Sequence, residues 1–195
     1  KFQKRNLLIT FHPVTLEVNT ADNQMAELLE ALEELGPEFN LIFTMPNADT
    51  DGRVVFKKIE QFIKSHPNAH LFKSLGQMRY LSCLQYVDAV VGNSSSGLTE
   101  APTFKKATIN IGDRQRGRIE APSVINCDPN KAAIKNALNT IYSTDFQAQL
   151  DMVVNPYGEG GASNAILEVI EGIPLDDLLK KRFFDFNNNA NSIYR

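Results

Sequence analysis

The sequence predicts an α/β protein built on a doubly wound parallel sheet of six strands. Two observations lead to this prediction. Short runs that are apolar on both faces recur along the chain, and amphipathic helical patterns lie between them. Strands that are apolar on both faces must be covered by helices on both sides, and strands that alternate with helices pair in parallel.

The strand-like runs come at intervals along most of the chain. In chain order they cover residues 6–11, 40–44, 69–72, 88–91, 107–111 and 123–127. Apolar helical stripes between them consist of Met25, Leu28, Leu29, Leu32 and Leu35, and of Val55, Ile59, Phe62 and Ile63. The first stripe ends at Gly36-Pro37, a pair that normally stops a helix. Further helices are expected over residues 131–142 and after a glycine-rich loop, where Ser163 or Asn164 serves as the N-cap.

Composition excludes several classes of protein. The chain has 195 residues, of which 43% are hydrophobic, so it can form one domain with a substantial core. A formal net charge of -3 indicates no basic face for nucleic acid, and no apolar run is long enough to span a bilayer. Cys83 and Cys127 lie far apart in apolar stretches, which is typical of reduced thiols in a cytoplasmic protein and favours neither a disulfide nor a metal site. Because the chain begins at Lys1, we expect it to be part of a longer protein.

Two unusual segments are expected at the same edge of the sheet. In a sheet ordered 3-2-1-4-5-6, strands one and four are neighbours whose connections leave in opposite directions, and ligands bind at their carboxyl ends. Strand one leads into "TFHPVT" at 10–15, and strand four leads into "VGNSSSG" at 91–97. The sequence therefore predicts a ligand site formed by these two segments.

The segment after strand four has the composition of an anion site. Its serines and Gly97 present hydroxyl and backbone N–H groups at the start of a helix that we expect to resume at Leu98, where the dipole adds about 0.3–1 kcal/mol. Glu100, in the first turn of that helix, is a poor neighbour for a phosphate but can accept hydrogen bonds from the vicinal hydroxyls of a ribose. A nucleotide diphosphate would suit both parts of this pattern.

Each candidate residue also has an ordinary structural explanation. Gly97 and Glu100 could form a capping pair, His12 could be a buried structural histidine, Asn47 could begin a turn with Asp49, and Arg114 could be a solvated surface charge. Their common position favours a function instead, because all of them follow the carboxyl ends of predicted strands and so lie on one edge of the sheet.

Several familiar sites are excluded by missing motifs. No GxGxxG follows strand one, so a dinucleotide site is disfavoured, and the sequence has no Walker loop, zinc spacing or GxSxG elbow. A hydrolase triad of His12, Ser94 and Asp88 is disfavoured because Asp88 begins a strand and therefore lies at the opposite end of the sheet.

Five segments together resemble the UDP-N-acetylglucosamine 2-epimerases. They are "FHPVT" at 11–15, "MPNADTDGR" at 45–53, "VVGNSSSGLTEAP" at 90–102, "INIGDRQRGR" at 109–118 and "NPYGEGGAS" at 155–163. The chain is most similar to the hydrolysing branch that serves sialic acid and related nonulosonic acid synthesis. The resemblance covers nearly the whole chain and implies the C-terminal, Rossmann-like half of a GT-B two-domain fold, with the active site in the cleft between the domains.

The resemblance also implies roles for individual residues. His12 would lie at the sugar diphosphate and act in catalysis, and Asn47 would line the cleft. Ser94 and Ser95 would bind the diphosphate, and Glu100 would bind the ribose hydroxyls. Arg114 would contact the nucleotide, and the backbone near Leu75 would bind uracil. Gly97 belongs to the same diphosphate-binding turn. "SGLTEAP" at 96–102 departs from the more usual family sequence, so Thr99 receives no role from the resemblance.

For the whole protein, the resemblance implies a cytoplasmic homodimer that binds a UDP-sugar and needs no cofactor or metal. UDP leaves by elimination across C1–C2 of the sugar, and water then adds to give the free 2-epimer, of the N-acetylmannosamine type. Most of the carboxylates for this chemistry would lie on an N-terminal domain. We expect residues 1–163 to form the UDP-binding domain and residues 164–195 to pack toward that N-terminal domain.

Two alternatives remain open from the residues alone. One is the donor domain of a GT-B glycosyltransferase, which also ends a strand in a Gly/Ser loop before a ribose-binding glutamate; "HPVT" and "NPYGEG" argue against it. The other is a separate nucleotide-binding module.

Overall fold

The computed structural model describes residues 2–14, 20–46 and 52–174. The chain divides into two compact units, Lys1–Glu159 and Gly160–Arg195. The first unit contains the sheet, and the second contains one described helix.

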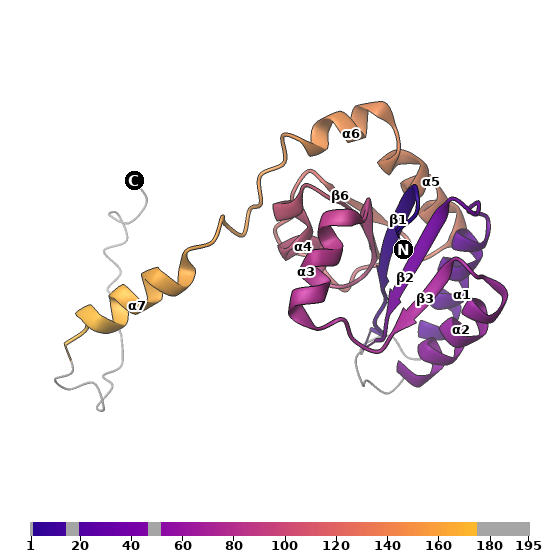
Figure 1. The fold of residues 1–195 in the computed structure, drawn as a ribbon, viewed down its shortest axis with the longest axis horizontal. Helices are drawn as coiled ribbons and strands as arrows, with labels where there is room; N and C mark the ends of the chain where they lie inside the picture. The colour runs from indigo at the N-terminus through magenta and orange to yellow at the C-terminus, as the bar shows by residue number, and fades with distance from the viewer. Residues whose placement is uncertain (1, 15–19, 47–51, 175–195) are drawn as a thin grey trace, which may run out of the picture. The chain divides into compact units, whose positions relative to one another are not determined.

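The first unit is the doubly wound sheet that the sequence predicts. Its strands are β1 (Arg5–Thr10), β2 (Phe39–Thr44), β3 (Ala69–Phe72), β4 (Ala89–Gly92), β5 (Ala107–Ile111) and β6 (Val124–Cys127). The order across the sheet is β3-β2-β1-β4-β5-β6, and every neighbouring pair is parallel (Figure 1). All six predicted strands are confirmed, with ends that shift by at most one residue.

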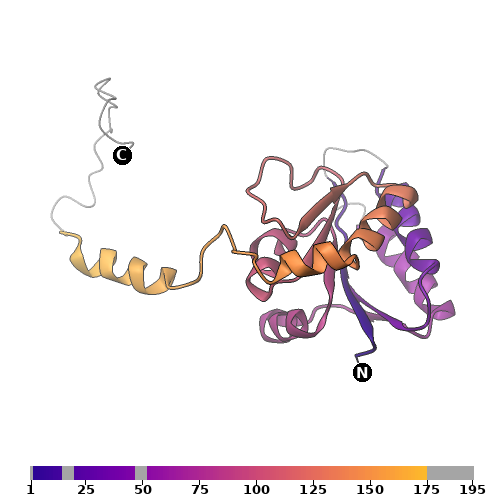
Figure 2. The ribbon, with the colours of Figure 1, turned by 90° about the horizontal axis from the view of Figure 1, so that it is seen from above.

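Helices cover both faces of this sheet (Figure 2). In the first unit they are α1 (Ala21–Glu33), α2 (Gly52–Ser65), α3 (Gly76–Tyr86), α4 (Ser96–Thr99), the 3₁₀ helix η1 (Ala101–Phe104), α5 (Lys131–Ile141) and α6 (Thr144–Leu150). The predicted stripes lie on α1 and α2, except for Leu35, which follows the C-cap of α1. Asn130 starts α5, because its side chain accepts a hydrogen bond of 2.9 Å from the Ala133 N–H.

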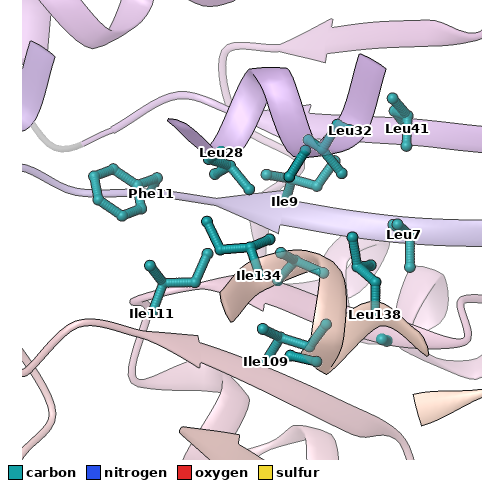
Figure 3. Packing of buried hydrophobic residues seen from close by; sticks show 14 of the residues in the cluster. Leu7, Ile9, Phe11, Leu28, Leu32, Leu41, Ile109, Ile111, Ile134 and Leu138 are labelled. Atoms are coloured by element: carbon teal, nitrogen blue, oxygen red, sulfur yellow. The ribbon is translucent and has the colours of Figure 1, made fainter. Parts of the chain in front are cut away.

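The alternation of side chains along each strand divides the core into two layers. Leu7 and Ile9 of β1 pack on the same side as α1, α2 and α5, where Leu28 and Ile134 contribute to one large cluster (Figure 3). Leu8, between them, belongs to the smaller cluster on the opposite side. That smaller cluster also contains Ile42, Cys83, Leu84, Val87, Val90 and Ala101. Both layers are needed to keep six strands out of water, which is why the strands are apolar on both faces.

A group of charged residues connects α1 to the start of α5. The Lys131 ammonium lies 2.8 Å from a carboxylate oxygen of Glu34, and Lys135 pairs with the other oxygen. The backbone N–H of Lys131 donates to the Glu27 carboxylate over 2.7 Å. The hydrogen bond from Lys131, followed by that from Lys135, lowers the pKa of Glu34 to about 2. These side chains join two helices that lie far apart in the sequence but side by side on the sheet.

The second unit contains α7 (Ala162–Gly172), and one prediction about it is wrong. The N-cap is Gly161, with φ of 83°, and neither Ser163 nor Asn164 caps the helix. A glycine adopts this left-handed backbone without steric cost, so the chain turns into the helix before either polar residue. No residue of α7 is buried. Among the described residues, no helix has both the length and the apolar character needed to cross a membrane.

Candidate functional site

The crevice predicted between strands one and four lies where their pairing ends. β1 and β4 pair as far as Thr10 and Gly92, after which the two chains continue into His12 and Asn93. Gly92 has φ of 131°, and a Cβ at this position would lie 2.0 Å from the Thr10 carbonyl oxygen. Only glycine therefore lets the segment after β4 turn so closely across β1.

Asn93 connects this segment to His12. The Asn93 Oδ1 accepts a hydrogen bond of 2.7 Å from the His12 N–H, and its Nδ2 donates one of 2.7 Å to the His12 carbonyl. Both residues are buried, with 1% of Asn93 and 7% of His12 exposed. The structure thus places His12 at the mouth of the crevice.

The loop after β5 reaches the same point. Arg114 donates from Nη1 to the Asn93 carbonyl over 3.0 Å, and Gln115 donates from Nε2 to the same oxygen over 2.8 Å. The explanation of Arg114 as a freely solvated surface charge is therefore wrong. Its guanidinium lies against the turn that was expected to bind an anion.

A pocket of about 390 Å³ opens beside this turn. Its lining includes Leu75, Ser94, Ser96 and Glu100, which the sequence singled out, and Thr10, Thr44, Lys73 and Tyr80, which it did not. Leu75, Ser94 and Glu100 thus line one cavity, whereas Ser95, Gly97, His12 and Arg114 are not among its lining residues. A larger cavity of about 980 Å³, between α5 and the loop after β5, contains none of the predicted site residues. Asn47 lies outside the described residues.

The helix after the serines differs from the prediction. α4 is a single turn that starts at Ser96, not Leu98, and Glu100 follows its last residue instead of lying in its first turn. The cause is Pro102, which has no N–H to donate and lies at the start of η1, so the chain tightens into a 3₁₀ turn. With so short a helix, the local N–H and hydroxyl groups matter more than a helix dipole.

The capping explanation for Glu100 is also wrong. The N-caps of α4 and η1 have no side-chain cap hydrogen bond. The Glu100 carboxylate accepts a bond of 3.3 Å from the Thr99 hydroxyl and otherwise faces the pocket. Its position fits a carboxylate that accepts hydrogen bonds from a ligand.

Two hydroxyl groups in the pocket lack partners. Within the described part of the chain, the buried Tyr80 hydroxyl and Ser96 Oγ make no hydrogen bond of good geometry, although the two side chains are near each other. Burial, assisted by the charge of Glu100, raises the pKa of Tyr80 to about 12. A buried hydroxyl without a partner costs about 1–3 kcal/mol, so this pair suits a polar ligand.

The alternative hydrolase triad does not form. Asp88 precedes β4 at the amino end of the sheet, where its carboxylate accepts bonds from the Asn6 N–H at 2.7 Å and the Tyr142 hydroxyl at 3.3 Å. His12 and Ser94 lie at the carboxyl end. The prediction that Asp88 is at the wrong end of the sheet is confirmed.

Comparisons with known proteins identify the family of the chain. A family model described as UDP-N-acetylglucosamine 2-epimerase matches residues 1–171. The chain is 37% identical to the GDP/UDP-N,N'-diacetylbacillosamine 2-epimerase (hydrolyzing) of Campylobacter jejuni, over 95% of this chain and 48% of that protein. It is 35% identical to the polysialic acid biosynthesis protein P7 of Escherichia coli, over 95% of this chain and 46% of that protein. The chain thus spans about half the length of these relatives.

A solved structure shares the fold. The S. aureus MnaA-UDP co-structure superposes with a TM-score of 0.69 at 20% sequence identity, over 87% of this chain and 45% of that one. At that identity the likeness concerns the fold alone, while the family model covers most of the sequence. The chain therefore belongs to the UDP-N-acetylglucosamine 2-epimerase family.

Proposed function

We propose that this chain is the UDP-binding half of a hydrolysing UDP-amino-sugar 2-epimerase. The observation that carries the proposal is the pocket lined by Ser94, Glu100 and the buried hydroxyls of Tyr80 and Ser96, directly after Asn93, which bonds both His12 and Arg114. Family membership favours the nucleotide-sugar substrate of a 2-epimerase as the occupant, in preference to the nucleotide-sugar donor of a glycosyltransferase.

UDP fits the pocket in one direction. The diphosphate accepts hydrogen bonds from the turn formed by Ser94, Ser95 and Gly97, next to the guanidinium of Arg114. The ribose then lies at Glu100, and uracil lies near Leu75, which lines the same pocket. A hydrogen bond to a charged group contributes about 1.5–3 kcal/mol, so Glu100 and Arg114 supply much of the affinity.

The proposed reaction is an elimination followed by an addition. A base removes the proton at C2 of the sugar while the bond from C1 to the diphosphate oxygen breaks, which forms a C1=C2 double bond. Water then adds its hydroxyl to C1, and C2 receives a proton on the face opposite to the one from which the first proton was removed. His12 lies where the diphosphate departs, so we assign it the role of proton donor or electrostatic anchor for UDP. In a protein of the relatives' length, His12→Ala should lower turnover about 10²–10⁴-fold.

The remaining groups are proposed to come from outside the described residues. The relatives are about twice as long as this chain, and the base for C2 would lie on their other half. The side chains of Ile166, Leu167, Val169 and Ile170 on α7 are more than half exposed, which supports packing of this helix against a further domain. A cytoplasmic homodimer is proposed from the resemblance alone, and gel filtration with cell fractionation would test it.

Calorimetry with UDP tests the proposal directly. We expect the chain to bind UDP weakly and UMP more weakly still. In a coupled assay it should release no UDP from UDP-N-acetylglucosamine or its diacetamido analogue.

Ser94→Ala should weaken UDP binding. Ser82→Ala is a matched control, because that hydroxyl bonds to the Met78 carbonyl within α3 and is exposed. No heat of binding at millimolar UDP would refute the nucleotide site, and rapid turnover by this chain alone would refute its assignment as one half of an enzyme.

A further inference from the structure

We propose that Asn93 is the positioning residue of this site, which sets His12 and Arg114 relative to the bound diphosphate. Only the identity of that ligand rests on the proposed function. The geometry around Asn93 is independent of it, since every contact is made within the described chain.

The Asn93 side chain continues the sheet where the backbone can no longer do so. The parallel pairing of β1 with β4 ends at Thr10 and Gly92, and the Asn93 N–H makes one more bond, of 3.2 Å, to the Thr10 carbonyl. The Asn93 amide then bonds both the N–H and the carbonyl of His12, each over 2.7 Å. A side-chain amide can form this pair because it carries a donor and an acceptor side by side, as a peptide group does.

The two hydrogen bonds with Asn93 restrict the backbone of His12 at both of its peptide groups. Pro13 follows directly and limits the chain further, because its ring fixes its own φ and disfavours helical backbone at His12. The imidazole thus leaves the sheet in a direction that Asn93 determines. The contact spans 81 residues of sequence, so the segment after β4 positions a residue that follows β1.

The backbone carbonyl of Asn93 holds the loop after β5 in a similar way. It accepts bonds from Arg114 at 3.0 Å and from Gln115 at 2.8 Å. Gln115 is buried, with 1% of its surface exposed, so this bond anchors the loop and not merely a surface side chain. One residue therefore joins the carboxyl ends of β1, β4 and β5, and Ser94 begins the proposed diphosphate turn directly after it.

The test compares Asn93→Ala with Asn110→Ala in the 195-residue chain. Asn110 is a matched control: it is buried to 3% exposure at the carboxyl end of β5, and its amide bonds Asn126 over 2.7 Å, away from His12. Two quantities are measured, namely hydrogen exchange of the His12 amide by NMR and the Kd for UDP. Asn93→Leu is the second variant if the alanine protein does not fold, since it keeps about the same volume but has neither the acceptor for the His12 N–H nor the donor for its carbonyl.

We expect Asn93→Ala to speed exchange of the His12 amide at least about tenfold while the Leu8 and Ile9 amides keep their protection. The Kd for UDP should rise about tenfold, whereas Asn110→Ala should change neither quantity. In a chain that already carries His12→Ala, the same Asn93→Ala change should raise the Kd less than about twofold, because the side chain that the Asn93 amide positions is gone.

An equal loss of affinity in both backgrounds would overturn the inference, because Asn93 would then act on UDP directly or through general stability. Unchanged exchange of the His12 amide would overturn it as well. If the unmodified chain binds no UDP, the proposed function fails, and the exchange measurement still decides whether Asn93 positions His12.

Discussion

The hydroxyl of Thr108 donates a hydrogen bond of 2.7 Å to the carbonyl of Gly97, while its methyl group occupies the space that a side chain at Gly97 would need. A Cβ at Gly97 would lie 2.5 Å from the Thr108 Cγ2. The position of the serine turn is thus determined by β5, the strand beneath it, as well as by β4, from which it emerges.

Gly97→Ala should therefore destabilise the protein by about 1–3 kcal/mol, the usual cost of inserting a methyl group into a packed interior. It should also weaken UDP binding, because the turn must move to make room. Adding Thr108→Ser should restore both properties, since serine lacks the methyl group but keeps the hydroxyl. Urea unfolding and calorimetry measure the two effects.

Gly172→Ala is the control for this prediction, because a Cβ there meets no atom within 4 Å. If Thr108→Ser does not rescue Gly97→Ala, contact with the Thr108 methyl is not what requires glycine at this position.

Glu100→Ala should weaken UDP binding with little change in the free energy of unfolding. Among the residues that the structure describes, the carboxylate caps no helix and bonds only the Thr99 hydroxyl, so the folded chain loses little without it. A bound ribose would lose a charged acceptor, which corresponds to about 1.5–3 kcal/mol. Calorimetry and the melting temperature of the same variant separate the two effects. A fall in melting temperature at constant UDP affinity would make Glu100 a structural residue.

Tyr80 should make the protein sensitive to alkali. Burial raises the pKa of its phenol from 10.0 to about 12, so the folded state retains a proton that the unfolded state releases. This contribution to stability is complete below pH 10.0 and is lost as the pH rises toward 12. Urea unfolding at several pH values should show that the free energy of unfolding falls less steeply with pH for Tyr80→Phe than for the unmodified chain.

Ionisation of Tyr80 can also be followed by phenolate absorbance. Tyr142 and Cys127 have raised pKa values as well, so part of the alkaline sensitivity should persist in Tyr80→Phe. Identical alkaline profiles for the two proteins would show that the Tyr80 hydroxyl is not buried in the folded state.

The local sequence pattern was sufficient to predict the sheet, because a strand that is buried on both faces consists mostly of apolar residues. The run at 89–92, for example, has no polar side chain and is buried throughout, and the spacing of the runs leaves room for a helix between most strands. The edge of the sheet on which His12, Ser94 and Arg114 lie also followed from topology, since parallel strands place their carboxyl ends together.

What the sequence did not reveal depends on contacts between distant segments. The role of Asn93 arises from a pairing with His12 that appears only when β1 and β4 are neighbours. Tyr80 enters the pocket from α3, whose pattern indicates only a helix. The position of Glu100 was misjudged because Pro102, two residues later, overrides the helical pattern around it. Proline in that position was the available signal.

The pairing of Glu34 with Lys131 and Lys135 should make the protein sensitive to acid. These hydrogen bonds lower the pKa of Glu34 from 4.5 to about 2, so the unfolded state takes up a proton before the folded state does. The stabilisation is complete above pH 4.5 and is lost as the pH falls toward 2. Thermal unfolding across this range should show a smaller loss of stability for Glu34→Gln than for the unmodified chain. Glu60→Gln, at an exposed position on α2, should behave like the unmodified chain.

Because the groups are solvent-exposed, 1 M salt should reduce the difference in stability between Glu34→Gln and the unmodified chain by shortening the screening length to about 3 Å. If Glu34→Gln and the unmodified chain lose stability in parallel between pH 4.5 and 2, the ion pairs between α1 and α5 contribute nothing to the fold.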